Sequence, residues 1–276
     1  MKTILITNDP LLAADAEAAG VSRIMVDLES HGKKERQASR TTFISSHARE
    51  DIAKVRAVLT KAELIVRINP WHEHSVAEMD YAIASGADII MLPMITDGEQ
   101  FSAFISHLNE RAKALPLIET GYSLQHIGKI AANAAIDELY IGLNDLHLSL
   151  GMDFLFEPLA GGQLDFMAKE ILSRGKAFGF GGIGVIGGEG ELSPGRILAE
   201  HARLGSSCVI LSTRFCTDRK IRTSEAVGRV ERLRAALGDL QGHYEELCKR
   251  TPSQQENDFK ETAAIIEAIA KKRKAS

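Results

Sequence analysis

The sequence contains no long apolar run, and this absence narrows the classes of protein that it can encode. No stretch of the 276 residues approaches the roughly 18 consecutive apolar residues of a membrane-spanning helix. The first residues, MKTILITNDP, carry too short an apolar run for a secretory signal peptide. We therefore expect a soluble, cytoplasmic protein with no membrane partner.

Cysteine is scarce as well. Cys208, Cys216 and Cys248 are the three cysteines of the chain, and they form neither a CxxC pair nor an even-numbered framework. Their number fits a reducing cytoplasm, and we expect them to serve ordinary packing.

A basic stripe with interleaved aromatic residues is also missing. The net charge is −4, and hydrophobic and charged residues make up 45% and 25% of the chain, the usual balance of a globular protein. A nucleic-acid partner is therefore not expected.

What the sequence does contain is a regular alternation of short apolar runs with helical segments. The runs cover residues 3–6, 23–28, 63–69, 88–94, 115–118, 139–143, 177–183 and 208–213. They are apolar throughout rather than alternating, which suits strands that are buried on both faces. Eight such units favour an α/β fold of the (β/α)8 TIM barrel type, and an open, doubly wound sheet is the alternative.

Two further helical segments follow the last run. We assign residues 1–220 to the barrel and residues 221–276 to a C-terminal helical extension. Its helices are expected at about 224–237, with Gly238 as the stop, and at about 256–273. The second helix has an apolar face with Phe259, Ile266 and Ile269, and the basic run KKRK near its end. This face must pack on its own chain or on a neighbouring subunit, and we predict the neighbour.

In such a barrel the chemistry takes place at the C-terminal ends of the strands. Glu119 follows the fifth run and Asp145 follows the sixth, with one helix between them. The two strands should therefore be parallel neighbours that end at the same edge. Two carboxylates there can hold a hard divalent cation, although acids after strands also commonly cap helices.

Other strands also carry polar residues at this edge of the barrel, which we call the rim. The second run carries Asp27 and is followed by Glu29, and the third carries Arg67 and is followed by Trp71. A buried arginine is costly unless it is paired. Either a structural salt bridge or a substrate carboxylate would account for it.

The succession VDLE, VRIN, IMLPM, LIET and IGLNDLHLSLG resembles the HpcH/HpaI aldolase family, which comprises metal-dependent pyruvate aldolases and citrate lyase beta subunits. The resemblance covers roughly residues 3–215, and the last two motifs are the most specific. Members of this family are (β/α)8 barrels of the phosphoenolpyruvate/pyruvate-binding type. They make or break a carbon–carbon bond next to pyruvate or an acyl-CoA thioester.

The resemblance also implies roles for individual residues. Glu119 and Asp145 would ligate Mg²⁺ or Mn²⁺, with Co²⁺ as a further candidate. Arg67 would face the keto acid as a catalytic and substrate-binding residue, and the backbone of Gly142, Leu143 and Asn144 would receive its carboxylate.

The acid/base group is less clear from the resemblance. A frequent aldolase pattern has histidine directly after the second-strand acid, whereas here Ser30 follows Glu29 and the histidine is His31. The second acid of the citrate lyase branch is absent at this position too. We take Glu29 and His31 as catalytic candidates, with a metal-bound water as the alternative and a solvated loop histidine as the simplest interpretation. Trp71 is expected to wall the site or simply to pack.

A glycine-rich segment at 179–184 matches GxGxxG, but no helix begins inside it, so a dinucleotide site is not indicated. We expect these glycines to let the backbone approach a ligand.

Together these features predict a class II aldolase. It would join pyruvate to an aldehyde, or split a 2-keto-4-hydroxy acid, through a metal-stabilised pyruvate enolate. The alternatives are a citryl-CoA or malyl-CoA type lyase on the same fold, and a catalytically inactive barrel that binds a ligand. A homo-oligomer, a trimer or hexamer, is expected.

Overall fold

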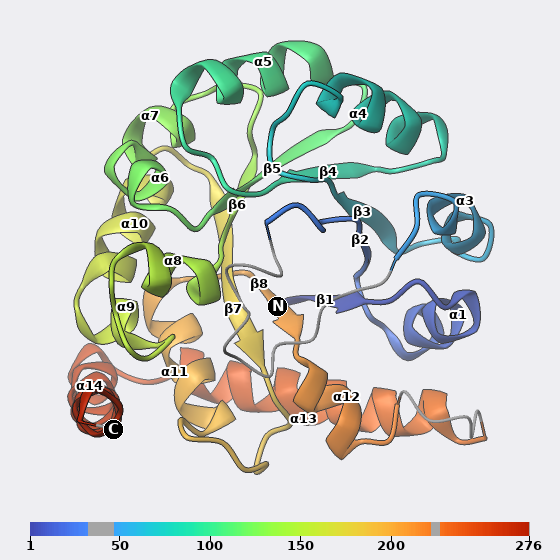
Figure 1. Cartoon of the computed structure of the whole chain (residues 1–276). Helices are drawn as coiled ribbons and strands as arrows, with labels where there is room; N and C mark the ends of the chain where they lie inside the picture. The colour runs from blue at the N-terminus through green and yellow to red at the C-terminus, as the bar shows by residue number, and fades with distance from the viewer. Residues whose placement is uncertain (33–46, 222–226, 276) are drawn as a thin grey trace.

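The structure is a computed structural model that describes residues 1–32, 47–221 and 227–275. Its eight strands form one closed parallel barrel in sequence order, and β1 closes the ring by pairing with β8 (Figure 1). The strands are β1 (Lys2–Ile6), β2 (Arg23–Asp27), β3 (Glu63–Arg67), β4 (Ile89–Leu92), β5 (Lys113–Ile118), β6 (Glu138–Ile141), β7 (Ala177–Ile183) and β8 (Cys208–Leu211). The predicted (β/α)8 barrel is confirmed, and the open sheet is wrong.

Helices surround the strands on the outside (Figure 1). They are α1 (Pro10–Ala19), α3 (Asp51–Arg56), α4 (Ser75–Ala84), α5 (Gly98–Leu108), α6 (Gly121–Gln125), α7 (Ile127–Ala131), α10 (Gln163–Leu172) and α11 (Pro194–Leu204). Three short helices, α8 (Leu143–Ser149), α9 (Glu157–Ala160) and α12 (Thr213–Asp218), follow β6 and β8, and α13 (Arg229–Cys248) and α14 (Pro252–Lys274) end the chain. The described helices include none that is long and apolar enough to cross a membrane.

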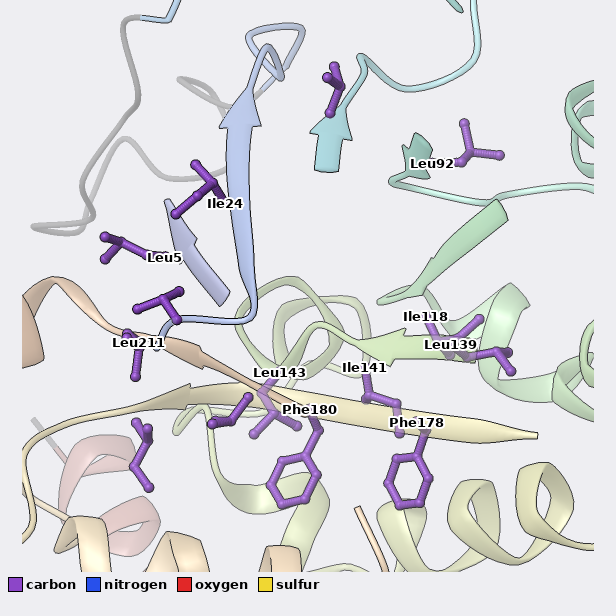
Figure 2. Close-up of a cluster of buried hydrophobic side chains, with 14 of the residues drawn as sticks. Leu5, Ile24, Leu92, Ile118, Leu139, Ile141, Leu143, Phe178, Phe180 and Leu211 are labelled. Atoms are coloured by element: carbon purple, nitrogen blue, oxygen red, sulfur yellow. The ribbon is translucent and has the colours of Figure 1, made fainter. Parts of the chain in front are cut away.

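Alternate strand residues face two different cores. One set packs between the strands and the helices, and Figure 2 shows Phe178 and Phe180 pointing from β7 towards that outer layer. The other set fills the barrel interior and includes Met25, Ile65 and Leu117. Because side chains alternate along a strand, residues two positions further on continue the interior column towards the ends of the barrel.

Both ends of the interior column are polar. At the N-terminal end, Arg23 is buried and contacts Glu63 at 2.8 Å and Glu138 at 2.7 Å. At the C-terminal end, Asp27 and Arg67 occupy the corresponding places on β2 and β3. In this fold the first cluster is the kind that supports stability, and the second lies where active sites are built.

The glycines at 179–184 make room for a tyrosine. A Cβ atom on Gly179 would lie 2.6 Å from the Tyr140 ring and 2.6 Å from Cys208 O. The Tyr140 hydroxyl donates to Gly181 O at 2.7 Å and accepts from Ile210 N at 2.8 Å, where the pairing of β7 with β8 shifts register. The close approach that Gly179 permits is therefore to a side chain of the same chain.

The C-terminal helices differ from their expected form. α13 continues through Gly238, so the predicted stop is wrong, because packing on α1 and α11 outweighs the low helix propensity of one glycine. α14 lies on α9 and α11, with Ile266 fully buried and the Arg203 guanidinium 4.2 Å from the Phe259 ring centre. The apolar face of α14 thus packs against its own chain. The packing of α14 on a second subunit stays a prediction.

Candidate active site

The centre of the site is an arginine held by a neighbouring aspartate. Arg67 on β3 stands directly beside Asp27 on β2. Its Nε and Nη2 atoms donate to the two carboxylate oxygens of Asp27, both at 2.8 Å. Its third nitrogen, Nη1, lies 3.4 Å from Glu29 Oε2. This two-point pairing fixes the plane of the guanidinium group.

These contacts also keep Arg67 charged. Burial alone would lower the pKa of Arg67, but the charge and hydrogen bonds of Asp27, followed by the charges of Glu29 and Glu119, raise it above its ordinary value. The arginine therefore presents a permanent positive charge at the rim although its side chain is only 15% exposed.

Glu119 enters the rim from the end of β5. It is buried, and its Oε1 atom accepts a hydrogen bond from Met94 N at 3.0 Å. Met94 adopts a φ of 51°, a left-handed conformation that is uncommon for residues other than glycine. Such backbone strain at the end of β4, where it aims an amide at a buried carboxylate, is typical of functional sites.

Three acids interact at this point of the rim. Burial, and then the nearby charges of Glu29 and Asp145, raise the pKa of Glu119 well above its ordinary value, while Arg67 and Met94 N oppose the shift. Among the described residues, the rim thus brings the carboxylates of Asp27, Glu29, Glu119 and Asp145 close to a single guanidinium group, that of Arg67.

Asp145 reaches the rim on a short helix. Gly142 N donates to Ile118 O at 3.0 Å, which extends the pairing of β5 and β6 by one residue beyond β6. The helix α8 begins immediately after Gly142, with Leu143 and Leu146 buried and Asp145 in its first turn. Asp145 lies near Glu119 because α8 begins only one residue, Gly142, after the end of β6.

The loop after β2 is tied to β3 by an asparagine. Asn69 Oδ1 accepts hydrogen bonds from Ser30 N at 2.9 Å and from His31 N at 3.1 Å. Its Nδ2 atom donates to Glu78 on α4 at 2.8 Å. The exposed ring of His31 lies 4.7 Å from the ring of His72. Asn69 thus sets the direction in which the loop leaves the barrel.

A second histidine lies at the end of β2. Asp27 N donates to His47 Nδ1 at 3.0 Å. His47 follows no strand and lies 20 residues from Asp27 along the chain, so its place in the sequence does not indicate this contact. A lone histidine before a helix gives no signal of its own.

The comparisons with known proteins agree with the geometry. A family model described as HpcH/HpaI aldolase/citrate lyase matches residues 4–188. The chain belongs to this family. The resemblance inferred from the sequence motifs is thereby confirmed. A search of curated proteins gives no match.

Solved structures of the same family share the fold. A family protein from Burkholderia cenocepacia J2315 is 16% identical, with a TM-score of 0.60, over 79% of this chain and 91% of that chain. Macrophomate synthase is 16% identical, with a TM-score of 0.58, over 83% of each chain. The protein CitE from Mycobacterium tuberculosis, in complex with magnesium and acetate, is 17% identical, with a TM-score of 0.58, over 90% of this chain and 97% of that chain. At these identities the likeness shows the fold alone.

The donor set of this family member suits a hard cation. Among the described residues, no group of three or more His, Cys, Asp or Glu side chains forms a ready-made metal site. Glu119 and Asp145 interact electrostatically, however, and Glu29 adds a third negative charge beside them. Mg²⁺ uses one or two carboxylates and completes its shell with water or substrate oxygens, so two ligands are enough. Their role as ligands stays a prediction.

The remaining predicted residues fall in two places. Gly142, Leu143 and Asn144 lie where β6 passes into α8, next to Glu119. Trp71 lines a surface hollow of about 540 Å³ beside the start of α5, together with Asp97, Glu99, Gln100 and Ala103. The structure therefore places Trp71 on the α5 side, and its role as a wall of the site stays a prediction.

Proposed function

We propose that this family member is a class II pyruvate aldolase, which joins pyruvate to an aldehyde or splits a 2-keto-4-hydroxy acid. The observation that carries the proposal is the rim itself. It combines an oriented, permanently charged arginine with three interacting acids, Glu29, Glu119 and Asp145. Negative charge that develops on a keto acid is stabilised by a fixed positive charge such as that of Arg67, and by a cation that the acids could hold.

The acids provide the place for a cation. Glu119 and Asp145 would hold Mg²⁺ or Mn²⁺, with Co²⁺ as a further candidate. When bound, the cation would supply Lewis-acid stabilisation of negative charge on a keto acid. The relative CitE was solved with magnesium and acetate, which supports a carboxylate ligand and magnesium in a site of this fold.

Arg67 supplies the part of the chemistry that belongs to the protein. Its guanidinium group is fixed in plane by Asp27, so it needs no rearrangement when charge appears on the keto oxygen. The backbone amides of Leu143 and Asn144 would bind the keto-acid carboxylate, since the first amides of a helix have no partner within the helix. The amide of Gly142, the third residue of the predicted set, already donates to Ile118 O.

The reaction also needs two proton transfers, one from the substrate and one to it. In the cleavage direction, the C3–C4 bond of the 2-keto-4-hydroxy acid breaks as the C4 hydroxyl loses its proton. The electron pair of that bond passes into the enolate of pyruvate, which then gains a proton at its methyl carbon. Glu29 is buried at the rim, and His31 lies on the loop that follows it. They are our candidates for these transfers.

A substrate screen tests the proposal. The protein is incubated with pyruvate, a panel of aldehydes and Mg²⁺, Mn²⁺ or Co²⁺, and the adducts are detected by mass spectrometry. Metal-dependent formation of 2-keto-4-hydroxy acids without CoA is expected. A strict requirement for a CoA thioester would instead show a citryl-CoA or malyl-CoA type lyase. Metal binding without turnover of either substrate class would show an inactive barrel.

A further inference from the structure

A hollow lies between α5 and the helix pair α6 and α7, in the ring of helices outside the strands (Figure 1). We call it the α5–α7 hollow. Its volume is about 310 Å³, at the lower end of the range for small-molecule sites. Arg67, Glu119 and Asp145 are not among the described residues that line it. The hollow is therefore a place for a ligand in addition to the rim.

The lining of the α5–α7 hollow is largely apolar and aromatic. Phe101 on α5 and Ile130 on α7 belong to it and are buried, with 8% and 3% of their surface exposed. Tyr122 and His126 also line it, and their rings stack with centres 4.1 Å apart and planes 22° apart. Aromatic faces favour offset-stacked contacts with other rings, so this lining suits a flat, apolar ligand body.

The stacked pair is held in place by the protein itself. A backbone carbonyl can only accept, so the 2.9 Å contact between His126 Nδ1 and Tyr122 O places a proton on Nδ1. The Tyr122 hydroxyl extends to the first residue of α5, where a Cβ atom on Gly98 would lie 3.1 Å from it. Because these rings are already ordered, a ligand would lose little of its binding free energy in ordering them.

The polar groups of the α5–α7 hollow favour an anion. Lys129 on α7 is exposed and lines the hollow, and none of the described carboxylates forms an ion pair with it. Asn133 Oδ1 accepts from Ala135 N at 2.9 Å, which leaves the amide nitrogen of Asn133 as a donor. The Tyr122 hydroxyl likewise makes no hydrogen bond within the described part of the chain. One ammonium group and two neutral donors are the groups that a carboxylate accepts from.

We propose that the α5–α7 hollow binds a small aromatic carboxylate, with its ring beside Phe101 and the stacked Tyr122 and His126, and its carboxylate facing Lys129. The apolar lining and the unpaired lysine together select this chemistry. An inorganic anion would leave the apolar lining without a partner, and a neutral ring would leave the ammonium group without one. This site does not depend on the aldolase proposal.

Titration calorimetry of the full chain with benzoate, benzamide and acetate tests the inference. EDTA is present throughout, so that no divalent cation at the rim can hold a carboxylate. Benzoate should bind saturably at millimolar concentrations. Benzamide should bind more weakly because it lacks the charge, and acetate because it lacks the ring. No saturable binding of benzoate, or equal affinity for benzoate and either of the other two compounds, would overturn the inference.

Two substitutions locate the site. Lys129→Met keeps most of the aliphatic stem and should weaken benzoate on the order of 5-fold, the usual size for one exposed ion pair. Ser102→Phe adds a ring to the hollow from an exposed position on α5 and should abolish benzoate binding. Lys61→Met, at an exposed lysine that does not line the hollow, is the matched control and should bind benzoate as the parent does.

The melting temperature of each variant should stay close to that of the parent, because all three positions are exposed. Benzoate affinity equal to that of the parent in Lys129→Met or in Ser102→Phe would place the ligand elsewhere, such as at the rim, and would overturn the inference. An equal loss in Lys61→Met and Lys129→Met would show a general effect of net charge and would overturn it too.

Discussion

Gly142 and Glu119 are in direct contact across the β5–β6 edge. A Cβ atom on Gly142 would lie 2.6 Å from Glu119 Oε2 and 3.0 Å from Glu119 Cβ. The absence of a side chain at Gly142 therefore creates the space in which the Glu119 carboxylate is seated, while Met94 N holds its other oxygen. A glycine that a sequence motif suggested as a backbone ligand for substrate also positions a predicted metal ligand.

This contact makes Gly142→Ala a test of the site. The φ and ψ of Gly142 are −89° and 92°, which alanine adopts without strain, so the effect should come from the displaced carboxylate. We expect Mn²⁺ affinity, measured by electron paramagnetic resonance, to fall on the order of 10–100-fold. Gly238→Ala is the control, because a Cβ there meets nothing within 4 Å. Equal Mn²⁺ affinity in Gly142→Ala and the parent would contradict this reading of the contact.

A second prediction concerns the predicted ligands themselves. Turnover should cease in EDTA and return with added Mg²⁺ or Mn²⁺, because Glu119 and Asp145 together supply the protein ligands. The double variant Glu119→Ala, Asp145→Ala should bind no Mn²⁺ and show no activity with any divalent metal, while its circular dichroism stays close to the parent. Full activity in this variant would exclude the assignment of these ligands.

The rim was largely predictable because it depends on strand order and period. Apolar runs of known spacing show where strands end, and residues at those ends, such as Arg67 and Glu119, meet at one face of a closed barrel. The sequence left two explanations for the buried Arg67, a structural salt bridge and the binding of a substrate carboxylate. These two explanations do not exclude each other. The structure shows the pairing with Asp27, while Nη1 extends towards Glu29.

Other features depend on contacts between distant residues, which no local pattern reveals. His47 accepts a hydrogen bond from Asp27 N, 20 residues away along the chain, and this contact exists only in the folded barrel. Gly179 is a glycine because the Tyr140 ring from the adjacent strand lies against it. The continuation of α13 through Gly238 likewise results from tertiary packing that overrides local propensity.

Asp51 should make stability depend on pH. Burial opposes its charge, but hydrogen bonds from Ala48 N, Asn8 and Lys54 lower the pKa of Asp51 to about 2, from an ordinary value of 3.8. A lowered pKa in the folded state stabilises the fold above about pH 4, and this stabilisation disappears as the pH falls towards 2. The shift corresponds to about 2 kcal/mol at neutral pH.

The variant Asp51→Asn measures this contribution. Urea unfolding at pH 7 should show a loss of about 2 kcal/mol relative to the parent, and the difference should narrow at pH 3. Glu73→Gln, at an acid whose side chain is 85% exposed, should leave the unfolding free energy unchanged at both values. A difference between Asp51→Asn and the parent that stays constant from pH 7 to pH 3 would argue against the carboxylate as its source.

The homo-oligomer prediction can be tested on α14. Removing residues after Thr251 should shift the mass seen by light scattering to a smaller species, if this helix also contacts a second subunit. Because Ile266 is buried within its own chain, the truncated protein should melt at a lower temperature as well. An unchanged oligomer with a lowered melting temperature would show that α14 serves only its own subunit.

The last prediction concerns Arg67, whose fork is paired with Asp27 at two points. Arg67→Lys keeps the charge but loses the planar fork, so its position relative to a developing enolate is no longer fixed. We expect kcat to fall on the order of 10²-fold or more, since the interaction should strengthen in the transition state. Circular dichroism should stay close to the parent. A retained kcat with a raised KM would show that Arg67 only binds the ground-state carboxylate, and an unfolded variant would show that its pairing with Asp27 is structural.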